Sequence, residues 1–299
     1  MHRKQFIRNT GLTLAGLAFL DISSFAKSLS RREYNIRMLT DYAGIFTEKG
    51  GTILFTLTGS GVVVVDSQFP DTAPHLIEEL QKKTTTGFNM LVNTHHHGDH
   101  TAGNIAFKGL VGKVLAHENS KINQQNAAVL NKTEDKQLYP TDIYKDTWSA
   151  NIDKEKVSLH YFGAGHTNGD SIVHFENAGI IHMGDLVFNR RHPYVDRKAG
   201  AHIKSWISVL NRTVETFGDK TRFVCGHAGQ GYDVLITKDD IRAFAKYLND
   251  TYNYVEGAVK AGKTKEEILK TTEIPGSPDW KGDGIERPLS AAYGEITEK

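Results

Sequence analysis

The chain has 299 residues, of which 39% are hydrophobic, and it carries 36 basic and 35 acidic side chains. This length suits one large domain or two small ones, and the near-neutral charge provides no general attraction to nucleic acid or to an acidic membrane. The single cysteine, Cys225, excludes an intramolecular disulfide and a thiolate metal cluster. Any bound metal must therefore be held by histidine and acidic side chains.

The first residues have the pattern of an export signal. Arg3 and Lys4 give a basic start, residues 11–20 form an apolar run, and residues 24–26 are a small-x-small cleavage motif. We therefore predict a signal peptide over residues 1–26 and an exported, periplasmic protein. The Arg3-Lys4 pair resembles a twin-arginine signal with lysine in place of the second arginine. The alternative is an amino-terminal membrane anchor, although the apolar run is shorter than the roughly 20 residues needed to span a bilayer.

The part of the chain that follows is rich in β-strand patterns. Short runs of β-branched and apolar residues, interrupted by glycine pairs, predict strands at 35–39, 44–47, 52–58 and 61–66. The last two are expected to form a hairpin, and the continuous apolar run Val62 to Val65 indicates a strand that is covered on both faces. Apolar residues at helical spacing then predict a helix over 71–83.

Strands and helices alternate through the rest of the chain. We predict strands at 88–93, 114–116, 156–162, 171–175, 179–183 and 222–225, and helices at 101–107, 118–130, 202–217, 238–260 and 263–271. The polar stretch 131–145 is expected to be a loop beside a pocket. This succession predicts an α/β fold with four layers, αββα, in which ligands bind at loops that follow strand ends.

The most informative stretch is Thr94-His95-His96-His97-Gly98-Asp99-His100, directly after the predicted strand 88–93. Imidazole is a common neutral metal ligand, and alternate residues of an extended segment point the same way, so His95 and His97 are predicted to bind one ion together. If the chain turns at Gly98, Asp99 and His100 face a second ion, at about the 3.5–4 Å spacing of two-metal hydrolytic sites. The alternative is a solvated histidine cluster, which would not need to follow a strand or continue into Gly-Asp-His.

Three further residues at strand ends are candidates to complete this site. His166 lies in a glycine-rich loop, Asp185 directly follows a predicted buried strand, and His227 repeats the strand-Gly-ligand arrangement. A carboxylate at position 185 can span two cations and offset their mutual repulsion. Taken singly, each residue is also consistent with a turn or capping role. Together with the histidine cluster, they predict one assembled metal site.

The four motifs together resemble those of the metallo-β-lactamase superfamily in order and spacing. They are His95-x-His97-x-Asp99-His100, Gly165-His166-Thr167, Gly184-Asp185 and Gly226-His227. The resemblance implies that residues 30–299 form a domain with the αββα sandwich of that family and a helical C-terminal end. It also implies that His95, His97 and His166 bind one metal, that Asp99, His100 and His227 bind another, and that Asp185 bridges the two.

Two residues distinguish the chain from the commonest zinc β-lactamases. Those enzymes have cysteine in place of Asp185, and they lack a histidine after the motif aspartate, where this chain has His100. The full ligand set is similar to that of glyoxalase II and other ester or thioester hydrolases, although the small glutathione-binding half of glyoxalase II is not obvious here. Flavodiiron proteins are disfavoured because they have an acidic residue at the position of His97.

The resemblance and the ligand set predict an exported binuclear metallohydrolase that acts on a small molecule. No nucleic-acid partner and no stable membrane insertion after signal cleavage are expected. Two divalent ions, with Zn²⁺ expected and Fe or Mn as alternatives, would lower the pKa of a bridging water from about 15.7 towards roughly 7. The resulting hydroxide would attack an ester, thioester, lactone or β-lactam carbonyl, with Asp99 as the catalytic residue that orients it.

Two other functions are left open by the sequence. A mononuclear iron dioxygenase acting on persulfides would use only His95, His97, His166 and Asp185, and the complete second ligand set argues against it. A non-catalytic periplasmic metal-binding or relay protein would use the same site without turnover. A phosphodiesterase or nuclease is disfavoured by the neutral charge and the export signal.

The remaining histidines are expected to have ordinary structural roles. His96 points away from its neighbours in an extended segment, and His160, His174 and His182 fall within predicted strands. The segment 189–196 follows Asp185 closely and could overhang the metals, where Tyr194 or His192 would orient substrate. Its alternative is a surface turn with solvated arginines. Cys225 is expected to pack as a small apolar residue.

Overall fold

The computed structural model describes residues 34–298. The chain divides into Met1–Tyr34 and Asn35–Lys299, and the fold given below is that of the second unit. The predicted signal at 1–26 lies outside the described residues and stays a prediction. Within the described residues, no helix combines the length and the apolar character needed to cross a membrane.

Seven strands form the first sheet in sequence order. The first four are antiparallel to their neighbours, and the fourth to seventh are parallel. They are β1 (Asn35–Met38), β2 (Ala43–Thr47), β3 (Ile53–Thr58), β4 (Gly61–Val65), β5 (Phe88–Asn93), β6 (Val111–His117) and β7 (Asp142–Tyr144). The predicted hairpin is confirmed as β3 and β4, and β4 is buried along its whole length, as expected for a strand covered on both faces.

Six strands form the second sheet, in the order β15-β13-β11-β10-β9-β8. Only β11 and β13 pair in parallel within it. The strands are β8 (Thr147–Ile152), β9 (Glu155–His160), β10 (Ile172–Phe175), β11 (Ile180–His182), β13 (Arg222–Val224) and β15 (Leu235–Ile236). A separate parallel pair is formed by β12 (Phe188–Asn189) and β14 (His227–Ala228).

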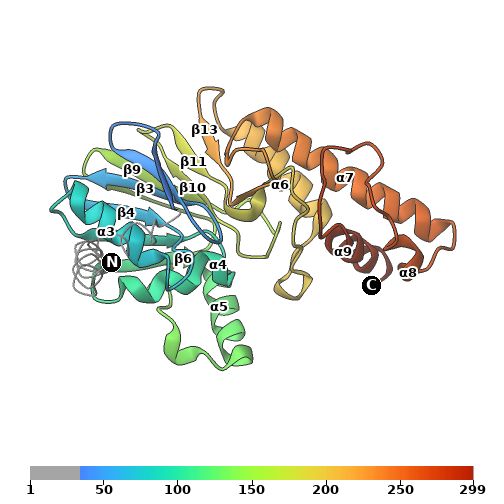
Figure 1. Ribbon diagram of the computed structural model, residues 1–299, viewed down its shortest axis with the longest axis horizontal. Coiled ribbons are helices and arrows are strands. Elements are labelled where there is room, and N and C mark those ends of the chain that lie inside the picture. Colours follow the sequence, from blue (N-terminus) through green and yellow to red (C-terminus); the bar gives the residue numbers. More distant parts are fainter. Residues whose placement is uncertain (1–33, 299) are drawn as a thin grey trace, which may run out of the picture. The chain divides into compact units, whose positions relative to one another are not determined.

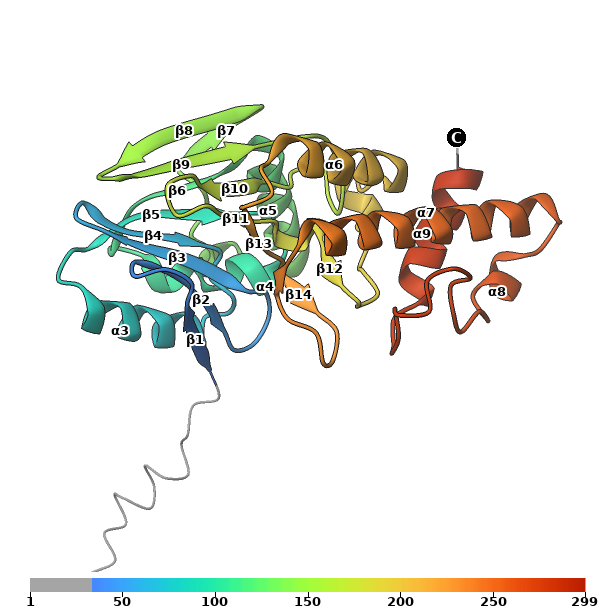
Figure 2. The ribbon, with the colours of Figure 1, turned by 90° about the horizontal axis from the view of Figure 1, so that it is seen from above.

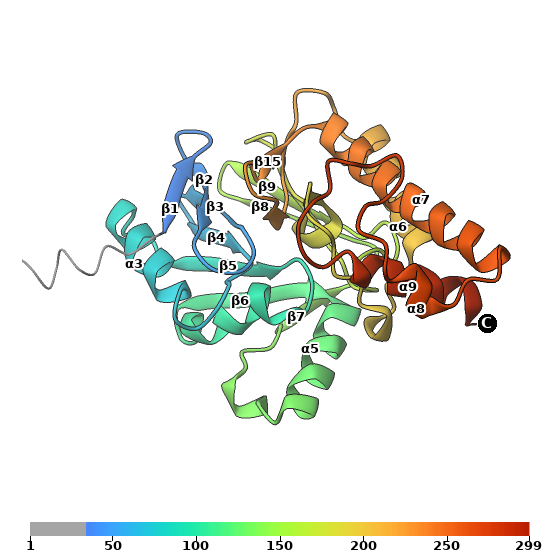
Figure 3. The ribbon, with the colours of Figure 1, turned by 45° about the vertical axis from the view of Figure 1, so that its right-hand side comes forward.

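Helices lie outside the two sheets, which confirms the predicted αββα arrangement (Figures 1 and 2). The α-helices are α3 (Ala73–Lys83), α4 (Gly98–Thr101), α5 (Glu118–Asn131), α6 (Ile203–Thr216), α7 (Lys238–Lys260), α8 (Lys265–Ile268) and α9 (Glu286–Thr297). Short 3₁₀ helices are η1 (Ala102–Phe107), η2 (Glu134–Lys136), η3 (Gly184–Leu186) and η4 (Arg197–Ala199). Helix α9 packs against α7, and α8 contacts α9 (Figure 3).

Two apolar clusters hold these layers together. One lies between the sheets and includes Val65 of the first and Val173 of the second. The other lies between the second sheet and helices α6 and α7, and it includes Ile172, the neighbour of Val173. Adjacent residues of a strand point to opposite faces, so β10 contributes to both clusters. The second sheet is therefore buried on both sides.

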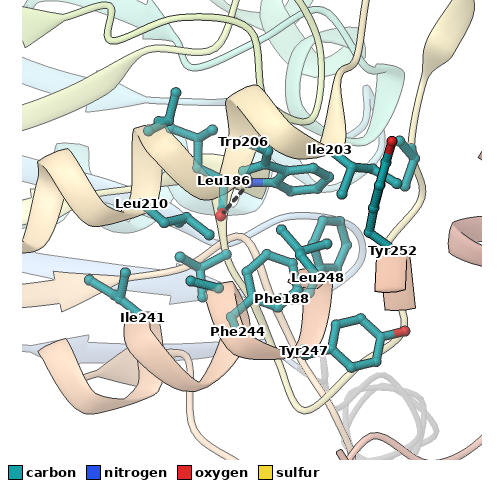
Figure 4. Packing of buried hydrophobic residues seen from close by; sticks show 14 of the residues in the cluster. Leu186, Phe188, Ile203, Trp206, Leu210, Ile241, Phe244, Tyr247, Leu248 and Tyr252 are labelled. Carbon is teal, nitrogen blue, oxygen red and sulfur yellow. Dashed lines mark hydrogen bonds between the residues drawn. The ribbon is translucent and has the colours of Figure 1, made fainter. Parts of the chain in front are cut away.

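An aromatic cluster under α6 and α7 fixes the segment that follows β11 (Figure 4). Trp206 is fully buried, and its indole Nε1–H donates to the carbonyl of Leu186 at 2.9 Å. The Phe244 ring lies 5.5 Å from the Trp206 ring and 6.2 Å from the Phe188 ring. Burial of each such side chain stabilises the fold by about 1.5–3 kcal/mol. This packing positions the chain on either side of Leu186, including Asp185.

Several elements differ from the sequence prediction, and all of them are short or polar. Strand β8 was not predicted because it is an edge strand whose alternate residues are exposed, which makes its composition polar. Strand β7 lies inside the predicted loop 131–145. The predicted helix 101–107 is the 3₁₀ helix η1, in which Gly103 lies tightly against Ser67. Helix α9 lies in the C-terminal end, for which the sequence predicts helix without bounds.

Candidate metal centre

The strand ends deliver the predicted ligands to one place. Parallel neighbours β4 and β5 end beside each other, and β5 leads directly into the loop that begins at Thr94. Parallel neighbours β11 and β13 likewise lead to Asp185 and His227, and the loop between β9 and β10 carries His166. The carboxyl ends of adjacent parallel strands share one edge, which is where ligands bind in open α/β sheets.

The seven predicted ligands lie in two adjoining groups of donor atoms, each within 4.8 Å. The groups are His95, His97, His166 and Asp185, and Asp99, His100 and His227. In the first group, Nδ1 of His97 lies 3.1 Å from Nε2 of His95 and 2.8 Å from Nε2 of His166. Oδ2 of Asp185 lies 4.0 Å from Nε2 of His95 and 3.6 Å from Nε2 of His166.

The three histidines of the first group are each held at the ring nitrogen that faces outward. The contacts are His95 Nδ1 with Thr94 Oγ1 (3.0 Å), His97 Nε2 with Asp196 Oδ2 (3.0 Å) and His166 Nδ1 with the Tyr194 carbonyl (2.8 Å). The carbonyl and the carboxylate only accept, and the Thr94 hydroxyl donates its own proton to Asp66. We therefore assign the ring protons to the outward nitrogens. Three inward lone pairs then converge on one point, where a cation would relieve their repulsion.

Burial keeps His95 and His166 neutral. Desolvation lowers the pKa of His166 to about 3, and it holds the pKa of His95 well below the usual value. Nearby imidazoles add to the shift at both rings, whereas the Asp185 carboxylate opposes it. Because a metal binds the unprotonated imidazole, both rings are in their ligand form at neutral pH.

The second group is centred on Nε2 of His227. That atom lies 3.0 Å from Oδ2 of Asp99 and 3.4 Å from Nε2 of His100. The other ring nitrogen of His100 donates to Oδ2 of Asp66 at 2.7 Å. Burial alone would raise the pKa of Asp99, but the hydrogen bond from His227 and the charge of His100 lower it, so Asp99 is a carboxylate at neutral pH.

Asp185 lies between the groups, in the position expected of a bridging ligand. Its Oδ1 is 3.1 Å from Nε2 of His100, and its Oδ2 is 3.5 Å from Nε2 of His227. Oδ1 is buried and makes no geometrically acceptable hydrogen bond to any described residue. Burial opposes ionisation of Asp185, but the charges of His227 and His100 hold its pKa well below the usual value. A buried carboxylate oxygen without a donor, surrounded by imidazoles, fits a cation.

Two glycines allow the donor groups to come this close. A Cβ atom on Gly226 would lie 2.0 Å from Oδ1 of Asp185, and one on Gly51 would lie 2.2 Å from the ring of His100. Neither separation is tolerated between real atoms. Glycine is therefore required at position 226, because a side chain there would overlap Asp185.

Two residues that orient the ligands were not predicted from the sequence. Asp66 directly follows β4, adopts a φ of 67°, and accepts hydrogen bonds from Thr94 and His100. The sequence does contain an indication of this role, because Asp66 ends the apolar run that forms β4. That strand pairs with β5, which leads to the histidines. Asp196 lies 99 residues from His97 in sequence, and only the fold brings them together. Although burial opposes this, hydrogen bonds with His96 and His97 lower the pKa of Asp196.

His96 forms a third group with His97 and Asp196, and His182 lies outside all three groups. Nε2 of His96 lies 3.5 Å from Asp196, outside the group formed by His95 and its partners. His182 contacts the Thr52 carbonyl at 2.8 Å and accepts from the Gly184 amide. Cys225 is fully buried, as expected for a packing residue.

A cavity of about 350 Å³ opens onto both groups. Its walls include the ligands His97, Asp99, His166, Asp185 and His227, together with Gly98, Phe188, Arg191, His192, Tyr194 and Arg287. The predicted overhanging segment 189–196 therefore borders the candidate site. The Tyr194 ring lies 5.5 Å from that of His97, whereas His192 is buried and its Nδ1 contacts the Tyr247 hydroxyl at 2.8 Å. Tyr194, which is 47% exposed, is better placed than His192 to contact a substrate.

The chain is similar to several known proteins. A family model described as the metallo-beta-lactamase superfamily matches residues 49–227. A type 2 metallo-beta-lactamase of Bacillus cereus is 24% identical over 208 residues, which cover 68% of this chain and 77% of that protein. The structure of a metallo-beta-lactamase from Pontibacter korlensis is 18% identical with a TM-score of 0.61, and the match covers 73% of this chain and 99% of that one. A stereoselective inverting sec-alkylsulfatase from Pseudomonas sp. is 14% identical with a TM-score of 0.71, over 88% of this chain and 50% of that one.

Proposed function

Because the chain belongs to the metallo-β-lactamase superfamily, we propose that it is a metal-dependent hydrolase that binds two divalent cations, with Zn²⁺ expected. The observation that carries the proposal is the convergence of three imidazole lone pairs beside Oδ1 of Asp185, a buried carboxylate oxygen without a hydrogen-bond donor. The proposed substrate is a carbonyl compound, namely an ester, a thioester, a lactone or a β-lactam. The structural neighbours include both lactamases and an alkylsulfatase.

The donor atoms suit the proposed metal. Zinc binds imidazole nitrogen and carboxylate oxygen, and its sites commonly have four ligands. His95, His97 and His166 would hold one cation, Asp99, His100 and His227 would hold the other, and Asp185 would be shared. When bound, two such cations supply a water of lowered pKa and polarise the carbonyl that it attacks.

The side chains around the cavity would bind and orient the reactants. Asp99 lines the cavity with its side chain 30% exposed, and as a carboxylate it can accept a hydrogen bond from the attacking water. Phe188 and Tyr194 provide apolar and aromatic walls that limit water around the substrate. Asp66 and Asp196 act as positioning residues, because they fix His100 and His97 without facing the cavity.

We also propose that the protein is exported. The support is the order of a basic start, an apolar run and a small-x-small motif within residues 1–26. Separation of periplasm from cytoplasm, followed by amino-terminal sequencing of the mature chain, tests it. Cleavage after Ala26 is expected, and an intact amino terminus in the cytoplasmic fraction would contradict the proposal.

The hydrolase proposal is tested by metal analysis together with a substrate panel. Metal-free protein would be reconstituted with zinc, iron or manganese, and hydrolysis of esters, thioesters, lactones and β-lactams would be measured. Two cations per chain and turnover of at least one substrate class are expected. Asp185→Ala should lower kcat/KM by about 100-fold or more, because the shared ligand is lost. The matched control is Asp233→Ala, which removes an exposed carboxylate that pairs with Arg37.

The result also separates the alternatives. One iron per chain with oxygen consumption on a persulfide would overturn the hydrolase proposal in favour of a dioxygenase. Full metal loading without turnover of any panel member would favour a non-catalytic metal-binding or relay protein.

A further inference from the structure

Two arginines line the cavity and have no role in the proposed metal chemistry. Arg191 lies in the segment that follows β12, and Arg287 lies in the first turn of α9. Both side chains are exposed, and they reach the same cavity from segments far apart in sequence. Arg287 also lies outside residues 49–227, the part of the chain that matches the family model.

These two guanidinium groups differ from the other arginines of residues 34–298. Of the six others, Arg212 lies over the ring of Phe162. The remaining five donate hydrogen bonds to other residues of the protein: Arg37, Arg190, Arg197, Arg222 and Arg242. Within the same residues, no hydrogen bond or ion pair of the Arg191 side chain is found. The ion-pair contact of Arg287 is a long one, 3.7 Å to Oε1 of the adjacent Glu286. Their hydrogen-bonding capacity is therefore directed to solvent and to the cavity.

We propose that Arg191 and Arg287 bind an anionic oxygen group of the substrate, a carboxylate or a sulfate. Guanidinium presents paired N–H donors that match both groups, and such charge-assisted bonds are stronger than neutral ones. A cavity of about 350 Å³ holds this group close to the bond that is cleaved. The inference rests on the proposed function and names the substrate class of that site.

The charges that line the cavity agree with an anionic substrate. Its acidic residues are Asp99 and Asp185, and the proposed function assigns both to cations. Two dications with two carboxylates leave a net positive site, and the two arginines add to it. A substrate without negative charge would leave both guanidinium groups hydrogen-bonded only to water.

Each arginine is carried by an anchored segment. Arg190, the neighbour of Arg191, donates to Asp240 at 2.6 Å and so ties its segment to α7. Helix α9 packs against α7 through the buried side chains of Leu289 and Ala292. The two arginines therefore start from fixed backbone positions, which lowers the entropy lost on binding an anion.

Equilibrium binding tests this inference without turnover. Succinate, methyl sulfate and the neutral analogue succinamide would be titrated calorimetrically into metal-free and zinc-loaded protein. Anion binding is expected in both forms, and Arg191→Gln and Arg287→Gln should each weaken it about tenfold or more. Arg242→Gln is the matched control, because Arg242 is an exposed arginine that pairs with Asp239 on α7. A preference for succinate or methyl sulfate identifies which anionic group is bound.

Kinetics provide the second readout. On matched carboxylated and neutral esters, the two glutamine variants should raise KM for the carboxylated ester about tenfold and leave the neutral ester within about twofold. Equal effects on both esters, anion binding unaffected by the variants, or no anion binding by the wild-type protein would overturn the inference. Failure of the hydrolase proposal is distinguishable, since it removes turnover of both esters and leaves anion binding to the metal-free protein intact.

Discussion

Asp170 is a buried carboxylic acid in the loop that carries His166. Its two oxygens accept hydrogen bonds from the backbone and the hydroxyl of Thr167, at 2.8 and 2.7 Å. Burial outweighs these bonds and raises the pKa of Asp170 to about 7. The acid therefore holds its proton more tightly in the folded protein than in the unfolded chain.

This shift predicts a pH dependence of stability. Between about pH 4 and pH 7 the folded protein binds more protons at Asp170 than the unfolded chain does, so this group's contribution to the free energy of unfolding falls as pH rises. The slope approaches about 1.4 kcal/mol per pH unit within that window. Urea unfolding would be measured for metal-free wild type and Asp170→Asn. The free energy of unfolding of the wild type minus that of the variant should fall from pH 4 to 7 and then level off. A difference independent of pH would contradict the shift.

Residue types in the sequence predicted which seven side chains gather, but not what orients them. Spacing within Thr94 to His100 indicated four of them, and positions at strand ends together with the family resemblance indicated His166, Asp185 and His227. Asp196 and Arg287 reach the site only through tertiary packing, and acidic or basic residues are common on surfaces. Asp66 was the exception, because its place at the end of a buried strand carried a usable signal.

The segment after β13 tolerates no side chain at Gly226 without a shift of its neighbours. The strand leads through Gly226 to His227, and a Cβ on Gly226 would overlap Oδ1 of Asp185 and crowd the backbone of Gly184. We predict that Gly226→Ala displaces Asp185 and preserves the fold. It should weaken binding of the cation assigned to Asp99, His100 and His227 by about 10–100-fold. Calorimetric zinc titration and circular dichroism would measure the two effects.

Gly218→Ala is the matched control, because a Cβ there meets nothing within 4 Å. Unchanged zinc binding by Gly226→Ala would mean that the loop relaxes without moving Asp185. That outcome would remove the steric explanation for glycine at this position.

Buried elements were easier to predict than edge elements. Strand β5 and helix α7 were predicted at their observed bounds, since continuous apolar runs and helical spacing are strong signals. Helix α7 also begins with a capping box between Thr237 and Asp240. Strand β8 has exposed alternate residues, and its pairing with β9 decides its conformation more than its own composition does.

At the scale of the molecule, the candidate metal centre joins the two sheets. His95, His97, Asp99 and His100 follow β5 of the first sheet, whereas His166, Asp185 and His227 follow strands β9, β11 and β13 of the second. The sheets already share an apolar core, so the fold does not depend on a cation for its layers. The relative position of the sheets, at the edge where the candidate ligands lie, nevertheless sets the distances between donor atoms. The sequence alone could therefore not give those distances.

Metal removal should therefore lower stability without unfolding the protein. Ligand that binds only the folded state adds about 4 kcal/mol at a thousand times Kd, which for a chain of this size corresponds to a Tm shift on the order of 10 °C. We expect calorimetric scans to show this loss after treatment with EDTA and its recovery when zinc is added back. Asp185→Ala should reduce the zinc-dependent shift, and Asp233→Ala should retain it. Equal Tm values for metal-free and zinc-loaded wild type would contradict a cation shared between the two sheets.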